Sequence, residues 1–94
     1  MTSLILSGVL IGCCDKDAIS TNIRDLNSPT AKERNAAALA LARCSGPKVE
    51  RAVPTLEQLL YDSNVGVQSS AAYALRRIDS LAARRAIGRA TEKR

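Results

Sequence analysis

The sequence has 94 residues, a formal net charge of +5 and no His, Trp or Phe. This length allows one small domain, whose core must be filled by Ala, Leu, Ile and Val. The lack of histidine excludes Ser-His and Cys-His nucleophile pairs, an imidazole general base and His-containing metal sites. With the repeat pattern described below, we expect a non-catalytic protein with no metal and no cofactor.

An apolar segment, residues 1–14, opens the chain. Its run LILSGVLI (residues 4–11) is too short to span a membrane, which needs roughly 20 apolar residues, but it has the length of a signal-peptide core. The tetrapeptide LIGC (residues 10–13) resembles the bacterial lipobox. The resemblance implies that Cys13 is lipidated and anchors a lipoprotein in the bacterial cell envelope.

Two other interpretations of this segment stay open, because Met1-Thr2-Ser3 lacks the Lys or Arg that usually precedes a signal core. Residues 4–12 are then an apolar helix or strand that packs on the domain or on a partner, or the start of the chain has lost upstream residues. Without lipidation we expect a cytoplasmic protein.

The three cysteines, Cys13, Cys14 and Cys44, are an odd number with no CxxC pair and no metal-ligand spacing. Cys13 and Cys14 are adjacent, so a bridge between them would be strained. The sequence therefore predicts no disulfide framework, and it places Cys44 in the core as a small apolar residue.

From residue 17 onward, apolar residues recur at helical spacing, as in Val67, Ala71, Ala74 and Ile78. Ser28-Pro29 and Pro54 are typical of helix starts, and Asp62 and Asp79 are predicted to cap helices. No alternating run predicts a strand. We expect antiparallel helices with short connections over residues 17–27, 29–44, 50–61, 64–78 and 81–91.

The chain also repeats itself at an offset of 34 residues. This offset aligns Leu26, Ala37, Ala38 and Leu41 with Leu60, Ala71, Ala72 and Leu75. A repeat of this length is typical of stacked helical units, each of which buries its apolar face against the next.

The segments AVPTLEQLLYD (residues 52–62) and VGVQSSAAYAL (residues 65–75) resemble a short bacterial HEAT repeat of the PBS-lyase-like type. The resemblance covers residues 18–91. It implies an all-α fold, an α-solenoid of antiparallel helix pairs with about two full repeats plus half-units, over residues 15–94. One departure is that the family's Val-Arg pair is only half kept, in Glu33-Arg34 and in Val67-Gln68.

The resemblance implies a protein–protein interaction scaffold or adaptor, because HEAT arrays bind proteins on a concave surface. A family-based alternative is an accessory subunit of a bilin or pigment lyase. A third interpretation follows from charge, since residues 76–94 carry seven basic and two acidic groups. This arginine cluster could bind nucleic acid or another anion, with an affinity that falls steeply with salt. The candidate partner-binding residues are Gln68, Tyr73, Arg76, Arg77, Arg84, Arg85 and Arg89.

Overall fold

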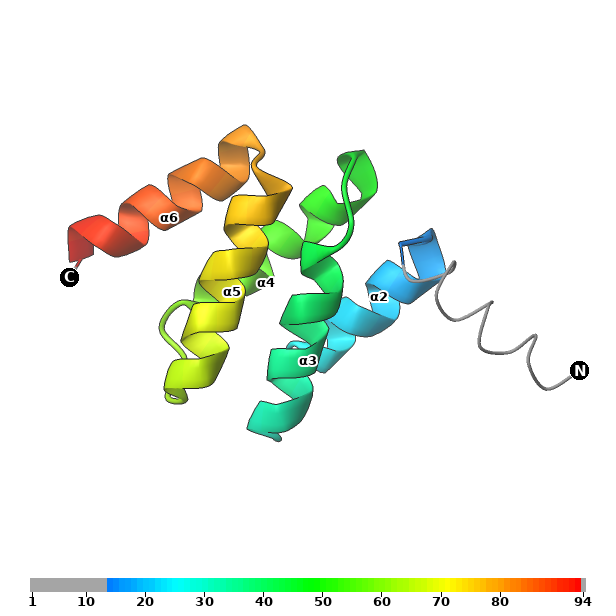
Figure 1. Cartoon of the computed structure of the whole chain (residues 1–94), viewed down its shortest axis with the longest axis horizontal. Coiled ribbons are helices and arrows are strands. Elements are labelled where there is room, and N and C mark those ends of the chain that lie inside the picture. Colours follow the sequence, from blue (N-terminus) through cyan, green and yellow to red (C-terminus); the bar gives the residue numbers. More distant parts are fainter. Residues whose placement is uncertain (1–13, 94) are drawn as a thin grey trace, which may run out of the picture.

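The computed structural model describes residues 14–93, and this part of the chain is helical without a β-strand. The elements are α2 (Lys16–Asp25), α3 (Ala31–Ala42), the 3-10 helix η1 (Pro47–Ala52), α4 (Val53–Leu59), α5 (Val65–Ile78) and α6 (Leu81–Lys93) (Figure 1). The predicted all-α class is confirmed for these residues. The predicted apolar segment 1–14 lies outside them, apart from Cys14.

Helices α3 and α5 lie side by side, and each packs against other elements on its own side (Figure 1). Helix α2 contacts α3 and η1, whereas α4 contacts η1, α5 and α6. Helix α6 also packs on α5, so α2 and α6 lie at opposite ends of the described chain. None of the described helices is long and apolar enough to cross a membrane.

The start of α3 and the N-cap of α6 differ from the prediction, whereas α6 begins at Leu81 as predicted. Helix α3 begins at Ala31 rather than at Pro29, with Thr30 as its N-cap residue. The Ser28 hydroxyl accepts a hydrogen bond from the Thr30 amide at 3.1 Å and also bonds to Glu33, so it closes the turn before the helix. Ser80 caps α6, because its hydroxyl accepts from the Ala83 amide at 3.0 Å. Asp79 is instead the left-handed C-cap residue of α5, with φ of 50°.

The expected helix 50–61 is two elements, η1 and α4. Gly46 precedes η1 with φ of 91°, a conformation that residues with a Cβ rarely adopt. Pro47 follows at the start of η1, where a missing amide hydrogen costs nothing. Pro54 lies at the start of α4, as the sequence predicts. The proline interrupts the backbone hydrogen-bond pattern, which separates η1 from α4.

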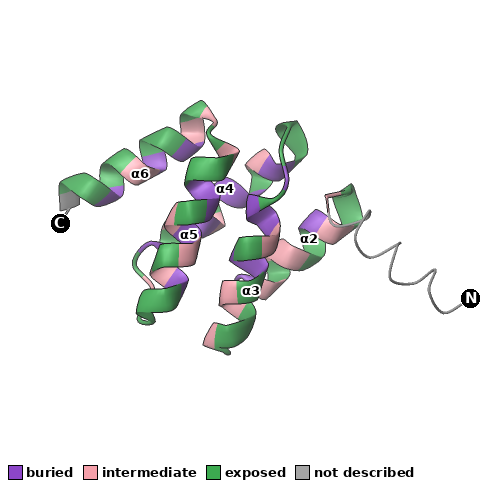
Figure 2. Ribbon diagram, in the orientation of Figure 1, coloured by how far each residue is buried: buried purple, intermediate pink, exposed green. Residues whose placement is uncertain are grey.

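A continuous apolar core joins all the elements (Figure 2). The largest fully buried side chains come from every helix except α6: Ile19, Leu26, Leu41, Leu56, Leu75, Val49 and Val67. Helix α6 contributes only Ala83, Ala86 and Ala90 to the buried set. Burying a Leu, Ile or Val side chain stabilises a fold by about 1.5–3 kcal/mol, and Ala by much less. The core is therefore strongest between α2 and α5 and weakest at α6.

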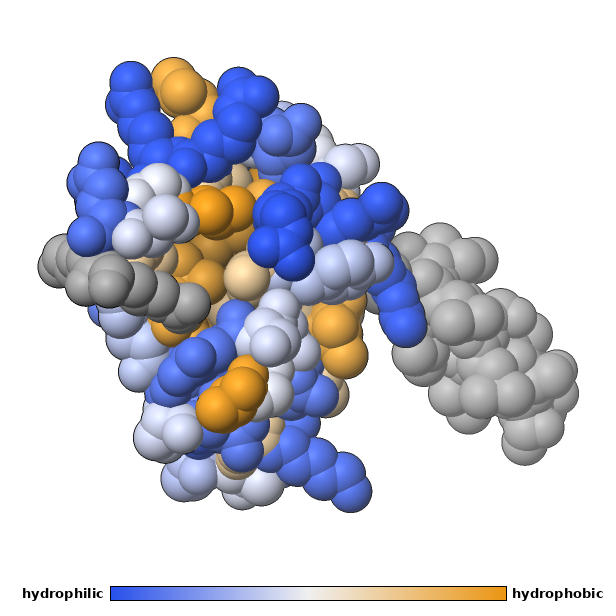
Figure 3. Space-filling model, turned by 60° about the vertical axis from the view of Figure 1, so that its left-hand side comes forward, coloured by the Kyte–Doolittle hydropathy of each residue, from blue (hydrophilic) through white to orange (hydrophobic). Residues whose placement is uncertain are grey.

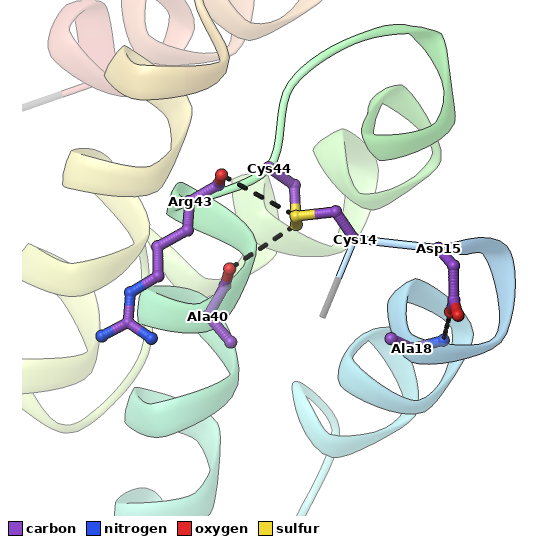
Figure 4. Close-up of a disulfide and its surroundings, with 6 residues drawn as sticks. All are labelled: Cys14, Asp15, Ala18, Ala40, Arg43 and Cys44. Carbon is purple, nitrogen blue, oxygen red and sulfur yellow. Dashed lines mark hydrogen bonds between the residues drawn. A yellow bond between two sulfur atoms is a disulfide. The ribbon is translucent and has the colours of Figure 1, made fainter. Parts of the chain in front are cut away.

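Cys14 and Cys44 form a disulfide, so the prediction that no disulfide framework exists is wrong. Their Cα atoms lie 5.3 Å apart, although 30 positions separate them in the sequence. Each sulfur also lies 3.7 Å from a backbone carbonyl oxygen, that of Arg43 for Cys14 and that of Ala40 for Cys44 (Figure 4). Cys44 is buried, as predicted. The bond ties the chain before α2 to the end of α3.

We expect the loss of this disulfide to destabilise the fold by about 3.5 kcal/mol, because a closed loop of this length removes that much chain entropy from the unfolded state. The measurement is urea unfolding of a Cys13→Ser chain, which keeps only the bonded pair, compared with Cys13→Ser/Cys14→Ser. Reductant should lower the unfolding midpoint of the first protein alone. Equal midpoints for both proteins under oxidising conditions would show that the bond does not stabilise the fold.

Candidate functional site

The first copy of the sequence repeat (residues 28–61) and the second copy (from residue 62 on) make the same side-chain contact, in the turn before α3 and in the turn before α5. Arg34 Nη1 donates to the Ser28 carbonyl oxygen at 2.8 Å, and Gln68 Nε2 donates to the Asp62 carbonyl oxygen at 2.5 Å. The two donors, Arg34 and Gln68, are 34 residues apart, and so are the two acceptors, Ser28 and Asp62. The N-cap residues Thr30 and Asn64 have the same offset. Helices α3 and α5 are therefore entered by equivalent turns.

A partly buried ion pair joins the first copy to the second. Arg34 Nη2 donates to Asp62 Oδ2 at 3.1 Å, and Arg34 Nε lies 3.0 Å from Asp62 Oδ1 without the alignment of a hydrogen bond. The side chains are only 15% and 10% exposed. Asp62 is not the N-cap of α5, as the sequence suggests, since Asn64 accepts from the Val67 amide instead. Asp62 is a link between copies.

The surroundings of Asp62 favour its charged form. Burial alone raises the pKa of this carboxyl, but the hydrogen bond from the Asn64 amide at 2.9 Å and the Arg34 guanidinium outweigh burial. The pKa of Asp62 is therefore lower than its ordinary value. The pair stays ionised at neutral pH, with the Arg34 guanidinium held in the junction between α3 and the turn before α5.

Exposed side chains form two matched pairs on α3 and α5. Leu39 and Tyr73 are 38% and 46% exposed and stand 34 residues apart, as do the exposed Arg43 and Arg77. Because α3 and α5 lie side by side, these four residues line one surface, which we call the ladder surface. It offers two apolar side chains and, one helical turn further on, two cations.

The sequence singles out Tyr73 and Arg77 but misses Leu39 and Arg43. The same 34-residue offset that reveals the repeat leads from the first pair to the second. Residues four apart lie on one face of a helix, so Tyr73 and Arg77 lie on one face of α5, and Leu39 and Arg43 are placed in the same way along α3. A shift of 34 residues from Tyr73 and Arg77 therefore identifies Leu39 and Arg43 from the sequence.

The remaining candidate residues lie elsewhere. Gln68 and Arg76 line a hollow of about 240 Å³ on α5 together with Ser69 and Ala72. Arg85 and Arg89 line a separate groove of about 410 Å³ between α4 and α6. The structure thus divides the seven candidates over several surfaces.

Two cations of the C-terminal arginine cluster have carboxylate partners. Arg89 donates from Nε and Nη2 to the two carboxylate oxygens of Glu57, both at 2.7 Å, and these hydrogen bonds raise the pKa of Arg89. Arg84 Nη1 lies 3.6 Å from Asp79 Oδ1. No ion pair is recorded for Arg76, Arg77 or Arg85 among residues 14–93. The positive charge available for a ligand is therefore concentrated on α5 and on Arg85.

No family model, curated protein or solved structure matches this chain.

We expect Arg34→Gln, which places in the first copy the residue found in the second, to destabilise the fold by roughly 2 kcal/mol. The partly buried Asp62 carboxylate loses its cation, which costs more than the loss of a fully exposed pair would. The pair also predicts acid sensitivity: its contribution is complete above the unfolded-state pKa of Asp62 and is lost as the pH falls through the lower folded-state pKa.

Urea unfolding between about pH 3 and pH 6 measures both effects. Asp62→Asn should flatten part of the acid-induced loss of stability, whereas Asp79→Asn, at an exposed position, is the matched control and should retain it. A normal unfolding free energy for Arg34→Gln at pH 7 would contradict the assigned role of the pair.

Proposed function

We propose that the protein is a non-catalytic, protein-binding scaffold built as a HEAT-like α-solenoid, with about two full repeats plus half-units. The observation that carries the proposal is the equivalence of contacts at the 34-residue offset. Arg34 and Gln68 bind equivalent carbonyl oxygens, and α3 and α5 start at equivalent residues. Repeated units that contact mainly their neighbours are the basis of a solenoid.

The ladder surface is the proposed partner-binding region. In a stack of repeats, equivalent positions form rows that a partner can follow across neighbouring helices. Leu39 and Tyr73 supply apolar contact area, and tyrosine is common among residues that dominate binding energies. Arg43 and Arg77 lie in the last turn or at the C-cap of their helices, where they add positive charge. These residues fit an acidic protein segment that carries an apolar anchor.

The disulfide supports a location in an oxidising compartment. Such bonds persist in secreted and periplasmic proteins and are rare in the reducing cytosol. Cys14 is bonded to Cys44, and Cys13 immediately precedes it at the position of the lipobox-like cysteine. We therefore propose a bacterial envelope lipoprotein whose Cys13 carries the lipid. In such a protein, the lipid anchor and the helical domain are adjacent.

The carboxylate partners of Arg84 and Arg89 weigh against nucleic-acid binding as the main function, because they neutralise two of the clustered cations. No feature of the described residues favours bilin chemistry. We therefore propose protein binding, rather than nucleic-acid binding or bilin chemistry, as the main function.

A photo-crosslinking amino acid at position 73 or 39 is expected to give a covalent adduct of defined mass in intact cells. The same amino acid at Gln58, an exposed position on α4, is the matched control and should give none. The combined variant Arg43→Glu/Arg77→Glu should reduce the adduct about tenfold, because it repels an acidic partner. Equal adducts from positions 73 and 58 would exclude the ladder surface as a specific site.

Membrane fractionation and intact-mass measurement test the proposed anchor. Expressed from Met1 in a bacterium, the chain should appear in the membrane fraction with a new N-terminus at Cys13 and the added mass of lipid. Cys13→Ala should remove the lipid mass, and Cys14→Ala should leave it. A soluble, unprocessed chain that begins at Met1 would exclude lipidation without affecting the proposed binding surface.

A further inference from the structure

The surface of α5 and α6 that faces away from α3 and α4, which we call the end face, corresponds to a surface that is covered in the first copy. Residues Ala38, Ala42, Cys44 and Val53 of the first copy are at most 4% exposed. The equivalent residues, 34 positions later, are more open: Ala72, Ile78 and Ile87 are only partly buried, and Arg76 is exposed. The equivalent helix face is therefore covered in the first copy and open to solvent in the second.

The end face has an apolar centre and a polar border. Figure 3 turns the α6 end of the molecule forward and shows apolar atoms surrounded by hydrophilic ones. Within this face, Gln68, Ser69, Ala72 and Arg76 line the hollow on α5. They are equivalent to Arg34, Asn35, Ala38 and Ala42 on α3, the helix that α5 covers. Helix packing against this register therefore already occurs inside the molecule.

We propose that the end face binds a second copy of this chain, with a two-fold axis passing close to Ala72. In such an arrangement the two α5 helices pack antiparallel, so the residue four positions before Ala72 meets the residue four positions after it in the other copy. The small Ala72 side chains allow the helices to approach closely at the axis. This proposal is independent of the ladder surface and of the proposed function.

The polar residues of the end face complement one another in this arrangement. Gln68 lies four residues before Ala72 and Arg76 four residues after it, so each Arg76 guanidinium faces Gln68 of the second copy. The Gln68 amide nitrogen already donates to Asp62, which leaves the Gln68 side-chain oxygen as an acceptor. The two arginines of position 76 lie at opposite ends of the interface, about 12 Å apart along the helix axis at 1.5 Å per residue.

Head-to-tail stacking is less favourable, because it loses the polar contacts that join α3 to α5. Within one molecule, Arg34 pairs with Asp62. If a second molecule continued the repeat, the equivalent contact would join Gln68 to Ser28 of that second molecule, and the ion pair would be lost. Within one molecule, Asn35 also accepts a hydrogen bond from Ser70. The equivalent contact in a head-to-tail stack would join Ser69 to Ala36 of the second molecule, which has no side-chain hydrogen-bonding group. A two-fold interface is closed, whereas head-to-tail contacts would extend into filaments. The loss of these polar contacts in a head-to-tail stack therefore favours the two-fold dimer.

The size of the face implies a weak dimer. Helix α5 has 14 residues, which gives a length of about 21 Å. Two packed helices present a face roughly 20 Å wide. Each copy therefore contributes about half of the ~800 Å² per partner that a standard stable interface buries. We expect monomer–dimer exchange at micromolar or higher concentrations.

Sedimentation velocity of the Cys13→Ser chain between about 1 and 500 µM measures this exchange and should show an apparent mass that doubles with concentration. Ala72→Arg should remain monomeric, because the long side chains collide at the axis, and its thermal melt should match the parent to show that it is folded. Thr21→Arg, on the exposed surface of α2, is the matched control and should dimerise normally.

Cysteine crosslinking distinguishes the arrangements. Ala72→Cys in the Cys13→Ser background should form an intermolecular disulfide with itself under mild oxidation, and Thr21→Cys should not. A chain that stays monomeric at every concentration would overturn the proposal and leave the end face to a different protein. Crosslinking of Ala72→Cys only to an Ala36→Cys chain would overturn it in favour of head-to-tail stacking.

Discussion

The arrangement of α3 against α5 depends on the partly buried ion pair between Arg34 and Asp62. The facing helix surfaces are rich in alanine, which permits close approach but gives few shape constraints that would fix how far one helix slides along the other. The Arg34 guanidinium binds Ser28 in the turn before α3 and Asp62 in the turn before α5, so one side chain links the two turns. Together with the hydrogen bond from Ser70 to Asn35, the pair fixes the position of the second copy relative to the first.

Helical periodicity was sufficient to predict the five α-helices, because amphipathic stripes depend only on local spacing. The helix ends were less predictable, since they depend on contacts across the fold. Asp62 has the sequence context of a cap, yet Arg34 pairs with its carboxylate and Asn64 caps α5 instead. The disulfide was missed for a similar reason: an odd cysteine count argues against pairing, but the fold brings Cys14 beside Cys44. The candidate arginines were chosen as one basic run, and packing against α4 separates Arg85 and Arg89 from Arg76 and Arg77.

The two ends of the described chain are stabilised differently. At the α2 end, the disulfide and the fully buried Ile19 and Leu26 hold the helix to the core. At the α6 end, three alanines and the exposed Arg89–Glu57 pair perform this role with less buried area and weaker electrostatics. Local opening is therefore expected to begin at α6. A partner on the end face would compensate for this difference, because it would bury Ile87 and cover the side of α6 that the core leaves open.

Helix α5 connects the proposed surfaces because its sides serve different contacts. One side packs on α3 and α4, Tyr73 and Arg77 belong to the ladder surface, and Gln68, Ala72 and Arg76 belong to the end face. The adjacent arginines 76 and 77 point about 100° apart around the helix, so neighbouring charges in the sequence belong to separate surfaces. Two copies joined through their end faces would keep both ladder surfaces exposed. Two linked ladder surfaces would bind a partner that carries two acidic segments more strongly than one surface does, through the higher effective concentration of the second site.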